Sequence, residues 1–111
     1  MLAIETLRTL DMAVWHRFSE EEARERTKLF LEQLKVEYAK KIAKLEEIWT
    51  GNKDEFSFSA LVMEMELPVS GDLVLEPSKI MIKITLPVAV IPFKEAIKKA
   101  LRTRINAALA A

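Results

Sequence analysis

The sequence predicts a two-layer α+β fold, in which an antiparallel β-meander of three to five strands packs against two amphipathic helices in the order (β)-α-β-β-β-α. Apolar residues recur every three or four positions early in the chain and again at its end, and they alternate with other residues in between. The chain has 111 residues, 50% of them hydrophobic. We therefore expect residues 1–111 to form a single domain, with residues 1–11 as a loosely packed extension.

A short strand over residues 12–17 is expected first, because apolar side chains alternate there. A helix then begins at about residue 20, since Ser19 and Glu22 have the spacing of a capping box. In that motif the Ser19 hydroxyl accepts a hydrogen bond from the Glu22 amide, and the Glu22 side chain reaches back to the Ser19 amide. Phe18 stands at the position before the cap, where an apolar residue often packs on the first turn.

The end of this helix is placed between residues 36 and 45, because no Gly or Pro interrupts the segment before Gly51. Its apolar stripe comprises Ala23, Thr27, Phe30, Leu31, Leu34, Tyr38, Ile42 and Leu45. A turn at residues 51–54 follows, flanked by Trp49 and by the alternating residues Phe56 and Phe58.

The next strand is predicted over residues 55–67, with a bulge or bend between Ala60 and Leu61, where the parity of the apolar residues changes. Pro68 and the segment Ser70-Gly71-Asp72 are expected to break this strand.

Two further strands are predicted over residues 73–75 and 80–86. In the second strand, apolar residues alternate regularly with the residues between them, so that one face is buried and the other is largely exposed to solvent. Val62 and Met81, on the less buried face of the sheet, leave room for a homodimer contact.

Pro87 and Pro92 bracket an apolar loop, and Pro92 suits the first position of a closing helix. This helix has its own apolar stripe, which predicts that it packs on the sheet. It also carries five basic residues against the single acid Glu95, a local net charge of +4. We interpret its exposed basic face as the candidate binding surface for an anionic partner: Lys94, Lys98, Lys99 and Arg102.

Composition argues against several functional classes. The chain has no cysteine, which removes disulfides and Cys-rich zinc sites, and its 17 Lys and Arg balance 17 Asp and Glu. Nucleic acid binding is not expected, because Phe56 and Phe58 have no interleaved basic residues. No apolar run approaches the roughly 20 residues that span a bilayer, and Glu5 stands where a signal peptide would be basic, so we expect a cytoplasmic protein.

His16 is the one histidine of the chain. A catalytic base needs an orienting acid and a nucleophile, and no nucleophile follows from the sequence. A structural role is therefore favoured, beside Phe18 and Trp49 or at the start of the first helix. The carboxylate pairs Glu46/Glu47 and Glu64/Glu66 are interpreted as solvated rather than as acid–base or metal-binding pairs. No metal or other cofactor is expected.

Several short motifs occur together in a characteristic order. They are His16-x-Phe18 before Glu22-Ala23-Arg24, Trp49-x-Gly51, Gly71-x-Leu73-x-Leu75, the alternation ending at Leu86, and Pro92-x-Lys94-x-x-Ile97 with Leu101. In this order and spacing the chain resembles, over roughly residues 12–109, the family of putative polyhydroxyalkanoic acid system proteins. These are small bacterial proteins encoded beside polyhydroxyalkanoate synthesis and granule genes.

The resemblance implies a non-enzymatic accessory or interaction protein, linked to polyester storage granules or to their proteins. The alternative is a small carrier that holds an acyl chain between the first helix and the sheet. A pocket of a few hundred cubic ångströms lined by Phe30, Leu34, Phe58 and Met63 would favour the carrier. An enzyme that uses His16 as a base is the third hypothesis.

Overall fold

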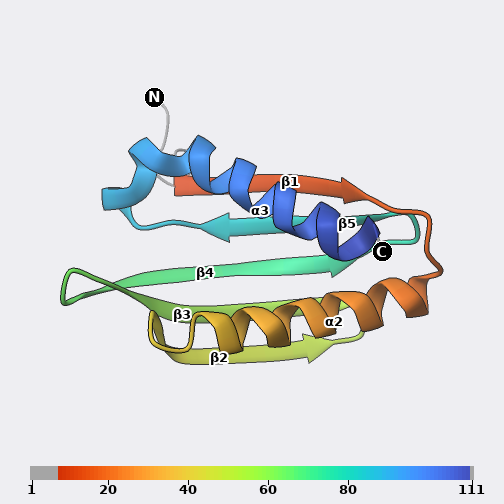
Figure 1. Ribbon diagram of the computed structural model, residues 1–111, viewed down its shortest axis with the longest axis horizontal. Helices are drawn as coiled ribbons and strands as arrows, with labels where there is room; N and C mark the ends of the chain where they lie inside the picture. Colours follow the sequence, from red (N-terminus) through yellow and green to blue (C-terminus); the bar gives the residue numbers. More distant parts are fainter. Residues whose placement is uncertain (1–7, 111) are drawn as a thin grey trace.

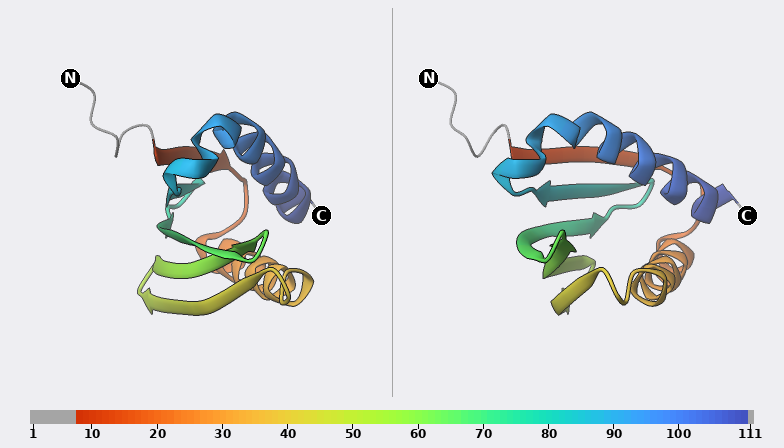
Figure 2. Two further views of the ribbon diagram at one scale, coloured as in Figure 1. Left: turned by 90° about the vertical axis from the view of Figure 1, so that its left-hand side faces the viewer. Right: turned by 60° about the vertical axis from the view of Figure 1, so that its left-hand side comes forward.

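The computed structural model describes residues 8–110, and these form an α+β fold with one five-stranded antiparallel sheet in the order β1-β5-β4-β3-β2. The strands are β1 (Thr9–Trp15), β2 (Ile42–Thr50), β3 (Lys53–Val62), β4 (Met65–Leu75) and β5 (Lys79–Thr85). The helices are α2 (Glu20–Glu37) and α3 (Lys94–Ala110), and the 3-10 helix η1 (Val88–Phe93) precedes α3. Both α-helices lie on the same side of the curved sheet (Figures 1 and 2). The predicted fold class is confirmed, but four strands rather than three separate the helices.

Strand β1 forms where a strand was predicted, but it begins earlier, at Thr9. It pairs with β5 from Thr9 opposite Thr85 to Trp15 opposite Lys79, and Leu10 is fully buried. Thr9–Asp11 are therefore part of the sheet and not of a loose extension, because the alternation of Leu10 with Met12 buries both side chains. Residues 1–7 of the expected extension lie outside the described residues.

Helix α2 begins as its capping signal predicts. The Ser19 hydroxyl accepts from the Glu22 amide at 3.1 Å, whereas the Glu22 carboxylate pairs with Arg26 one turn later. The helix ends at Glu37, so the assignment of Ile42 and Leu45 to its stripe is wrong. Both belong to β2, where a register shift between Ala43 and Glu46 disturbs the alternation that would identify a strand.

The β2–β3 hairpin turns where predicted, with Gly51 at a φ of 61°. The turn is shorter than predicted, because Lys53 and Asp54 already belong to β3. The predicted bulge at Ala60 and Leu61 is wrong, since β3 and β4 pair without interruption up to Val62 opposite Met65. Their turn is formed by Met63 and Glu64, both at positive φ, although neither is the Gly, Asn or Asp usual in such turns.

Pro68 and Gly71 lie inside β4 rather than ending a strand. Pro68 falls outside the part of β4 that pairs with β5, which begins at Ser70, so its missing N–H costs no hydrogen bond to that strand. At Gly71 a Cβ atom would collide with the carbonyl oxygen of Lys83 and lie 2.9 Å from Cζ of Phe56. The glycine therefore makes room for the Phe56 ring on the sheet.

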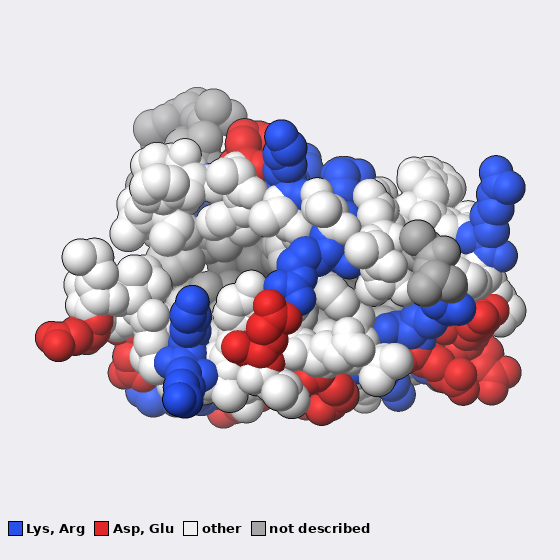
Figure 3. Space-filling view, in the orientation of Figure 1, with Lys and Arg blue, Asp and Glu red and all other residues white. Residues whose placement is uncertain are grey.

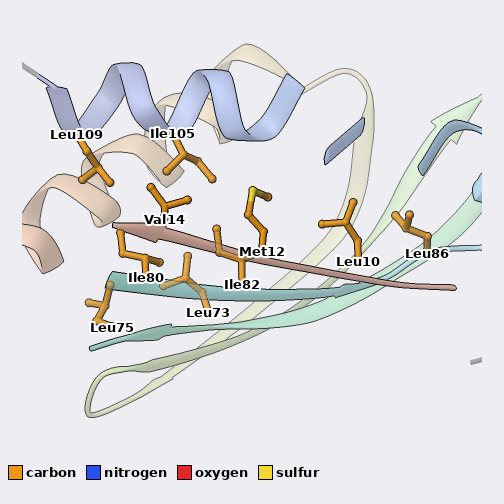
Figure 4. Close-up of a cluster of buried hydrophobic side chains, with 10 residues drawn as sticks. All are labelled: Leu10, Met12, Val14, Leu73, Leu75, Ile80, Ile82, Leu86, Ile105 and Leu109. Carbon is orange, nitrogen blue, oxygen red and sulfur yellow. The ribbon is translucent and has the colours of Figure 1, made fainter. Parts of the chain in front are cut away.

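The closed core occupies one part of the space between the sheet and the helices. Figure 4 shows alternate side chains of β1, β4 and β5 meeting the second half of α3. Its members are Leu10, Met12, Val14, Leu73, Leu75, Ile80, Ile82, Leu86, Ile105 and Leu109, all at most 8% exposed. The predicted packing of the last helix on the sheet is thus observed, although Pro92 lies in η1 and α3 begins at Lys94.

Candidate functional site: an apolar cavity between the helices and the sheet

A cavity of about 440 Å³ lies where the closed core ends, between α2, α3 and the middle of the sheet. Figure 3 shows the surface hollowed beside α3. Most of its lining is apolar and comes from both helices and from four strands: Phe30, Leu31, Leu34, Tyr38, Ile42, Leu45, Phe56, Phe58, Leu73, Ile82, Ile84, Ile97, Ala100, Leu101 and Ile105. Its volume and lining are typical of small-molecule pockets.

The cavity exists because the helices cover different parts of the sheet. Helix α3 contacts β1, α2 contacts β4, and the two helices also contact each other. Between these contact regions the apolar side chains of the helices and of the sheet do not pack closely on one another. Phe30, Leu34, Phe58 and Leu101 are therefore only partly buried. A close-packed interior would bury such residues almost completely.

Three residues that line the cavity, Glu47, Phe56 and Ile84, lie with Gly71 in one row of paired residues across four strands. Glu47 of β2 lies opposite Phe56, Phe56 opposite Gly71, and Gly71 opposite Ile84. The Phe56 ring stacks against Phe58 with centroids 6.4 Å apart. A side chain at Gly71 would crowd the Phe56 ring and the backbone of β5, which explains a glycine in the middle of a strand.

One wall of the cavity is polar and consists of Lys35, Glu47 and Asp54. Lys35 Nζ donates to Glu32 Oε1 at 2.9 Å and to Glu47 Oε1 at 3.0 Å, and these hydrogen bonds raise the pKa of Lys35. Asp54 is 1% exposed, and no described residue donates a hydrogen bond to its buried Oδ1. An orphaned carboxyl oxygen at a cavity wall is a candidate contact for a ligand.

The two carboxyl groups of this wall have pKa values that are shifted in opposite directions. Burial, followed by hydrogen bonding with Glu47, raises the pKa of Asp54 to about 7. Burial acts in the same direction on Glu47, but its hydrogen bonds with Asp54 and Lys35 outweigh burial and lower its pKa. At neutral pH Glu47 is therefore the charged member of the pair, and Asp54 holds its proton up to about pH 7.

The mouth of the cavity is bridged by a contact between the helices. The Arg104 guanidinium of α3 donates to both carboxylate oxygens of Glu37 at the end of α2, and also to the Tyr38 hydroxyl at 3.1 Å. Tyr38 and Arg104 both line the cavity. These bonds join the end of α2 to a residue inside α3, and the bonded residues are 66 and 67 positions apart in sequence.

The basic residues predicted as a binding surface lie elsewhere. Lys94 and Lys98 are half-buried and Lys99 and Arg102 are exposed on α3, and none of the four lines the cavity. Arg102 donates to the backbone carbonyl of Ala13 at 3.3 Å, which ties α3 to β1.

His16 lies in the connection between β1 and α2, and it does not line the cavity. Its Nδ1 accepts from the Phe18 amide at 3.2 Å, and its ring stacks on Phe18 with centroids 6.1 Å apart. Its Nε2 has no hydrogen-bond partner in the described part of the chain, so the structure brings no acid or hydroxyl to it. Among residues 8–110 there is also no cluster of three His, Asp or Glu side chains that could hold a metal ion.

The predicted pocket residues divide between the cavity and the surface. Phe30, Leu34 and Phe58 line the cavity, whereas Met63 is 88% exposed at the β3–β4 turn. The prediction for Met63 is wrong because it placed this residue in the middle of a strand, whereas Met63 lies in the turn between β3 and β4. The sequence interpretation also missed Asp54, which it assigned to a turn, and treated Glu47 as solvated. A period of two from Asp54 through Phe56 to Phe58 is the signal that places Asp54 on the inner face.

Within the described range, neither helix is long and apolar enough to cross a membrane.

None of the curated proteins compared with the chain matches it. Among solved structures, the crystal structure of TTHA0849 from Thermus thermophilus is similar at 13% identity, with 92% of each chain covered and a TM-score of 0.36. The family model described as "Putative polyhydroxyalkanoic acid system protein" matches residues 10–109. The chain therefore belongs to the family of putative polyhydroxyalkanoic acid system proteins.

Proposed function

We propose that this protein is a non-enzymatic component of polyhydroxyalkanoate metabolism, and that it binds a ligand with an apolar chain in the cavity between α2, α3 and the sheet. The cavity is the observation that carries the proposal, with its volume of about 440 Å³ and its lining of aliphatic and aromatic side chains. Family membership supports the metabolic context.

The cavity favours the carrier among the functions that the sequence suggested. An apolar ligand would gain the free energy of burying its chain, at about 25 cal/mol per Å² of apolar surface. It would also cover side chains such as Phe58 and Leu101, which the fold leaves partly exposed. Non-enzymatic binding fits the position of His16, whose ring contacts Phe18 rather than the cavity.

The experiment is a fluorescence titration with N-phenyl-1-naphthylamine, an uncharged apolar probe that brightens when it leaves water. We expect saturable binding to the wild-type protein. Leu34→Trp places an indole ring in the cavity in place of the smaller leucine side chain and should abolish binding of the probe. Leu29→Trp is the matched control, because Leu29 lies on the same helix but is 61% exposed and does not line the cavity. Equal binding by the two variants would contradict the proposal.

A second candidate function is contact with the anionic surface of a polyester granule or of its proteins. It is favoured by the first turns of α3, where Lys94, Lys98 and Lys99 form no ion pair within the described residues. The preceding η1 exposes apolar side chains beside them, with Val88 57% and Phe93 62% exposed. Basic and apolar groups side by side are typical of helices that bind at an interface.

Co-sedimentation with isolated granules tests this candidate. We expect the wild-type protein to sediment and the variant Lys94→Glu/Lys98→Glu/Lys99→Glu to remain in the supernatant, with binding that weakens as salt rises. The variant Lys40→Glu/Lys41→Glu is the control, because these exposed residues lie in the α2–β2 connection. A wild-type protein that stays in the supernatant at low salt would contradict granule contact and leave the cavity proposal standing.

A further inference from the structure

The polar wall of the cavity contains a buried carboxyl group, Asp54. A cavity that served only to hold a hydrocarbon would need no buried carboxyl group, since burying a polar group without a partner costs free energy. Asp54 is nevertheless 1% exposed, and its Oδ1 has no hydrogen-bond donor among the described residues. This buried, unpartnered oxygen belongs to a side chain that lines the cavity.

The neighbours of Asp54 leave its carboxyl group able to accept. Burial and hydrogen bonding with Glu47 raise the pKa of Asp54, and Lys35 donates its ammonium hydrogens to Glu47 and Glu32. Lys28 contributes only through its charge at longer range, and it lies over the Trp49 ring at 4.9 Å. None of these groups donates a hydrogen bond to Oδ1. A ligand that donates a hydrogen bond would satisfy it.

The same wall disfavours an anionic head group. Glu47 carries a negative charge there, and a ligand carboxylate beside it would add a second charge in a site of low polarity. An ether or ester oxygen offers no hydrogen to the unpartnered oxygen. A hydroxyl group is the smallest uncharged donor that meets both requirements.

We propose that the cavity binds an apolar chain that carries a hydroxyl group, and that this hydroxyl donates a hydrogen bond to the Asp54 carboxyl group. This inference rests on the proposed apolar-ligand function and adds the class of ligand. The chain occupies the surface formed by Phe56, Phe58 and Leu101, and the hydroxyl lies at the wall formed by Asp54 and Glu47. The Asp54 carboxyl group thus contacts the ligand and distinguishes a hydroxyl from an ether or a carboxylate.

Three probes of similar length test the inference by displacing N-phenyl-1-naphthylamine at pH 6.5: 1-decanol, its isomer 1-methoxynonane, and decanoate. We expect 1-decanol to bind about tenfold more tightly than the ether, the effect of one hydrogen bond. Decanoate should bind more weakly than 1-decanol. Asp54→Leu should bind both uncharged probes with equal affinity. Glu55→Gln, an exposed neighbour on the opposite face, should keep the wild-type preference.

Each outcome separates the inference from the proposed function. Equal affinity of the wild-type protein for 1-decanol and the ether would overturn the hydroxyl assignment, while the apolar-ligand function would stand. Tightest binding of decanoate would also overturn it, in favour of a head group held by Lys35. A protein that binds no probe would contradict the proposed function itself. If Asp54→Leu does not fold, Asp54→Ala replaces it, because alanine also removes the acceptor oxygen. An unchanged preference of Asp54→Ala for 1-decanol over the ether would count against the inference.

Discussion

Arg104 of α3 and Glu37 at the end of α2 form a bidentate ion pair, with Nη1 2.9 Å from Oε1 and Nη2 2.5 Å from Oε2. The pair stands at the mouth of the cavity, where Arg104 also donates to the Tyr38 hydroxyl. It joins the two helices that cover the sheet, close to Lys35, which bonds the last turn of α2 to Glu47 of β2. Its geometry matches the planar guanidinium to the planar carboxylate.

The Arg104–Glu37 pair should hold the last turn of α2 against α3. We expect Arg104→Gln to speed amide hydrogen exchange at residues 34–38, and the charge swap Arg104→Glu/Glu37→Arg to restore part of the protection. The effect should shrink as salt rises, because both side chains contact solvent. Arg26→Gln is the control, since it breaks an ion pair within α2 alone. Equal exchange in Arg104→Gln and the wild-type protein would show that the pair does not hold the helix.

Gly71 should be less tolerant of substitution than Gly51. In Gly71→Ala the new Cβ would meet the fixed backbone of β5 and the Phe56 ring, so we expect a loss of about 3 kcal/mol in the free energy of unfolding. Gly51→Ala meets no atom within 4 Å and should cost about 1 kcal/mol, because only its φ of 61° is unfavourable for alanine. Urea denaturation measures both. A smaller loss at Gly71 than at Gly51 would contradict the register of β4 and β5.

Truncating a side chain to alanine should lower the free energy of unfolding less at the cavity wall than in the closed core. Ile80 is 2% exposed, and Ile80→Ala should lower the free energy of unfolding by about 3 kcal/mol, because it removes apolar contacts and leaves a new hole. Leu34 already borders empty space, so Leu34→Ala should cost only about 1 kcal/mol. The same urea experiments measure the difference. Similar losses at both positions would mean that the space around Leu34 is filled.

Asp54 should make the protein less stable as the pH rises. The folded-state pKa of about 7 lies above the ordinary value of 3.8, so between these pH values the native state keeps a proton that the unfolded state has released. The free energy of unfolding therefore falls as pH increases through this window. Asp54→Asn cannot titrate, and its stability relative to the wild-type protein should increase from about pH 4 to about pH 7.

Glu37→Gln provides the contrast for this pH series. The hydrogen bond from Arg104 lowers the pKa of Glu37 below its ordinary value of 4.5, so its contribution to stability is present at neutral pH and is lost only as the pH falls through the folded-state pKa. Its difference from the wild-type protein should stay constant between pH 5 and pH 8. A constant difference for Asp54→Asn over the same range would show that Asp54 is not buried as a neutral acid.

The elements that were predicted correctly are those identified by local sequence features, such as a helix cap, a regular alternation or a turn glycine. The Ser19 cap fixes the start of α2, and the alternation of Ile80, Ile82 and Ile84 identifies β5 because one face of that strand is buried. Gly51 marks its turn because its φ is positive.

The errors arise where tertiary packing overrides such local signals. Ile42 and Leu45 continue the helical spacing of α2, yet pairing with β3 makes them part of a strand. Met63 and Glu64 form a tight turn without a turn residue, because the long pairing of β3 with β4 brings their flanking residues together. Gly71, a turn signal in sequence, is required in mid-strand by the ring of Phe56 on the neighbouring strand.

The candidate site could be predicted only in part. Phe30, Leu34 and Phe58 were expected in a pocket because their periodicity places them on inner faces. The polar wall could not be predicted, since Lys35, Glu47 and Asp54 come from three elements and meet only after the sheet has formed.

Methyl NMR of the protein with bound 1-decanol tests the central claim most directly. With labelled isoleucine methyl groups, we expect intermolecular nuclear Overhauser effects from the decyl chain to Ile42, Ile84 and Ile97, which line the cavity. Ile48, which is 66% exposed and does not line it, should show none. Contacts to Ile48, or chemical-shift changes confined to exposed residues, would contradict a ligand site between the helices and the sheet.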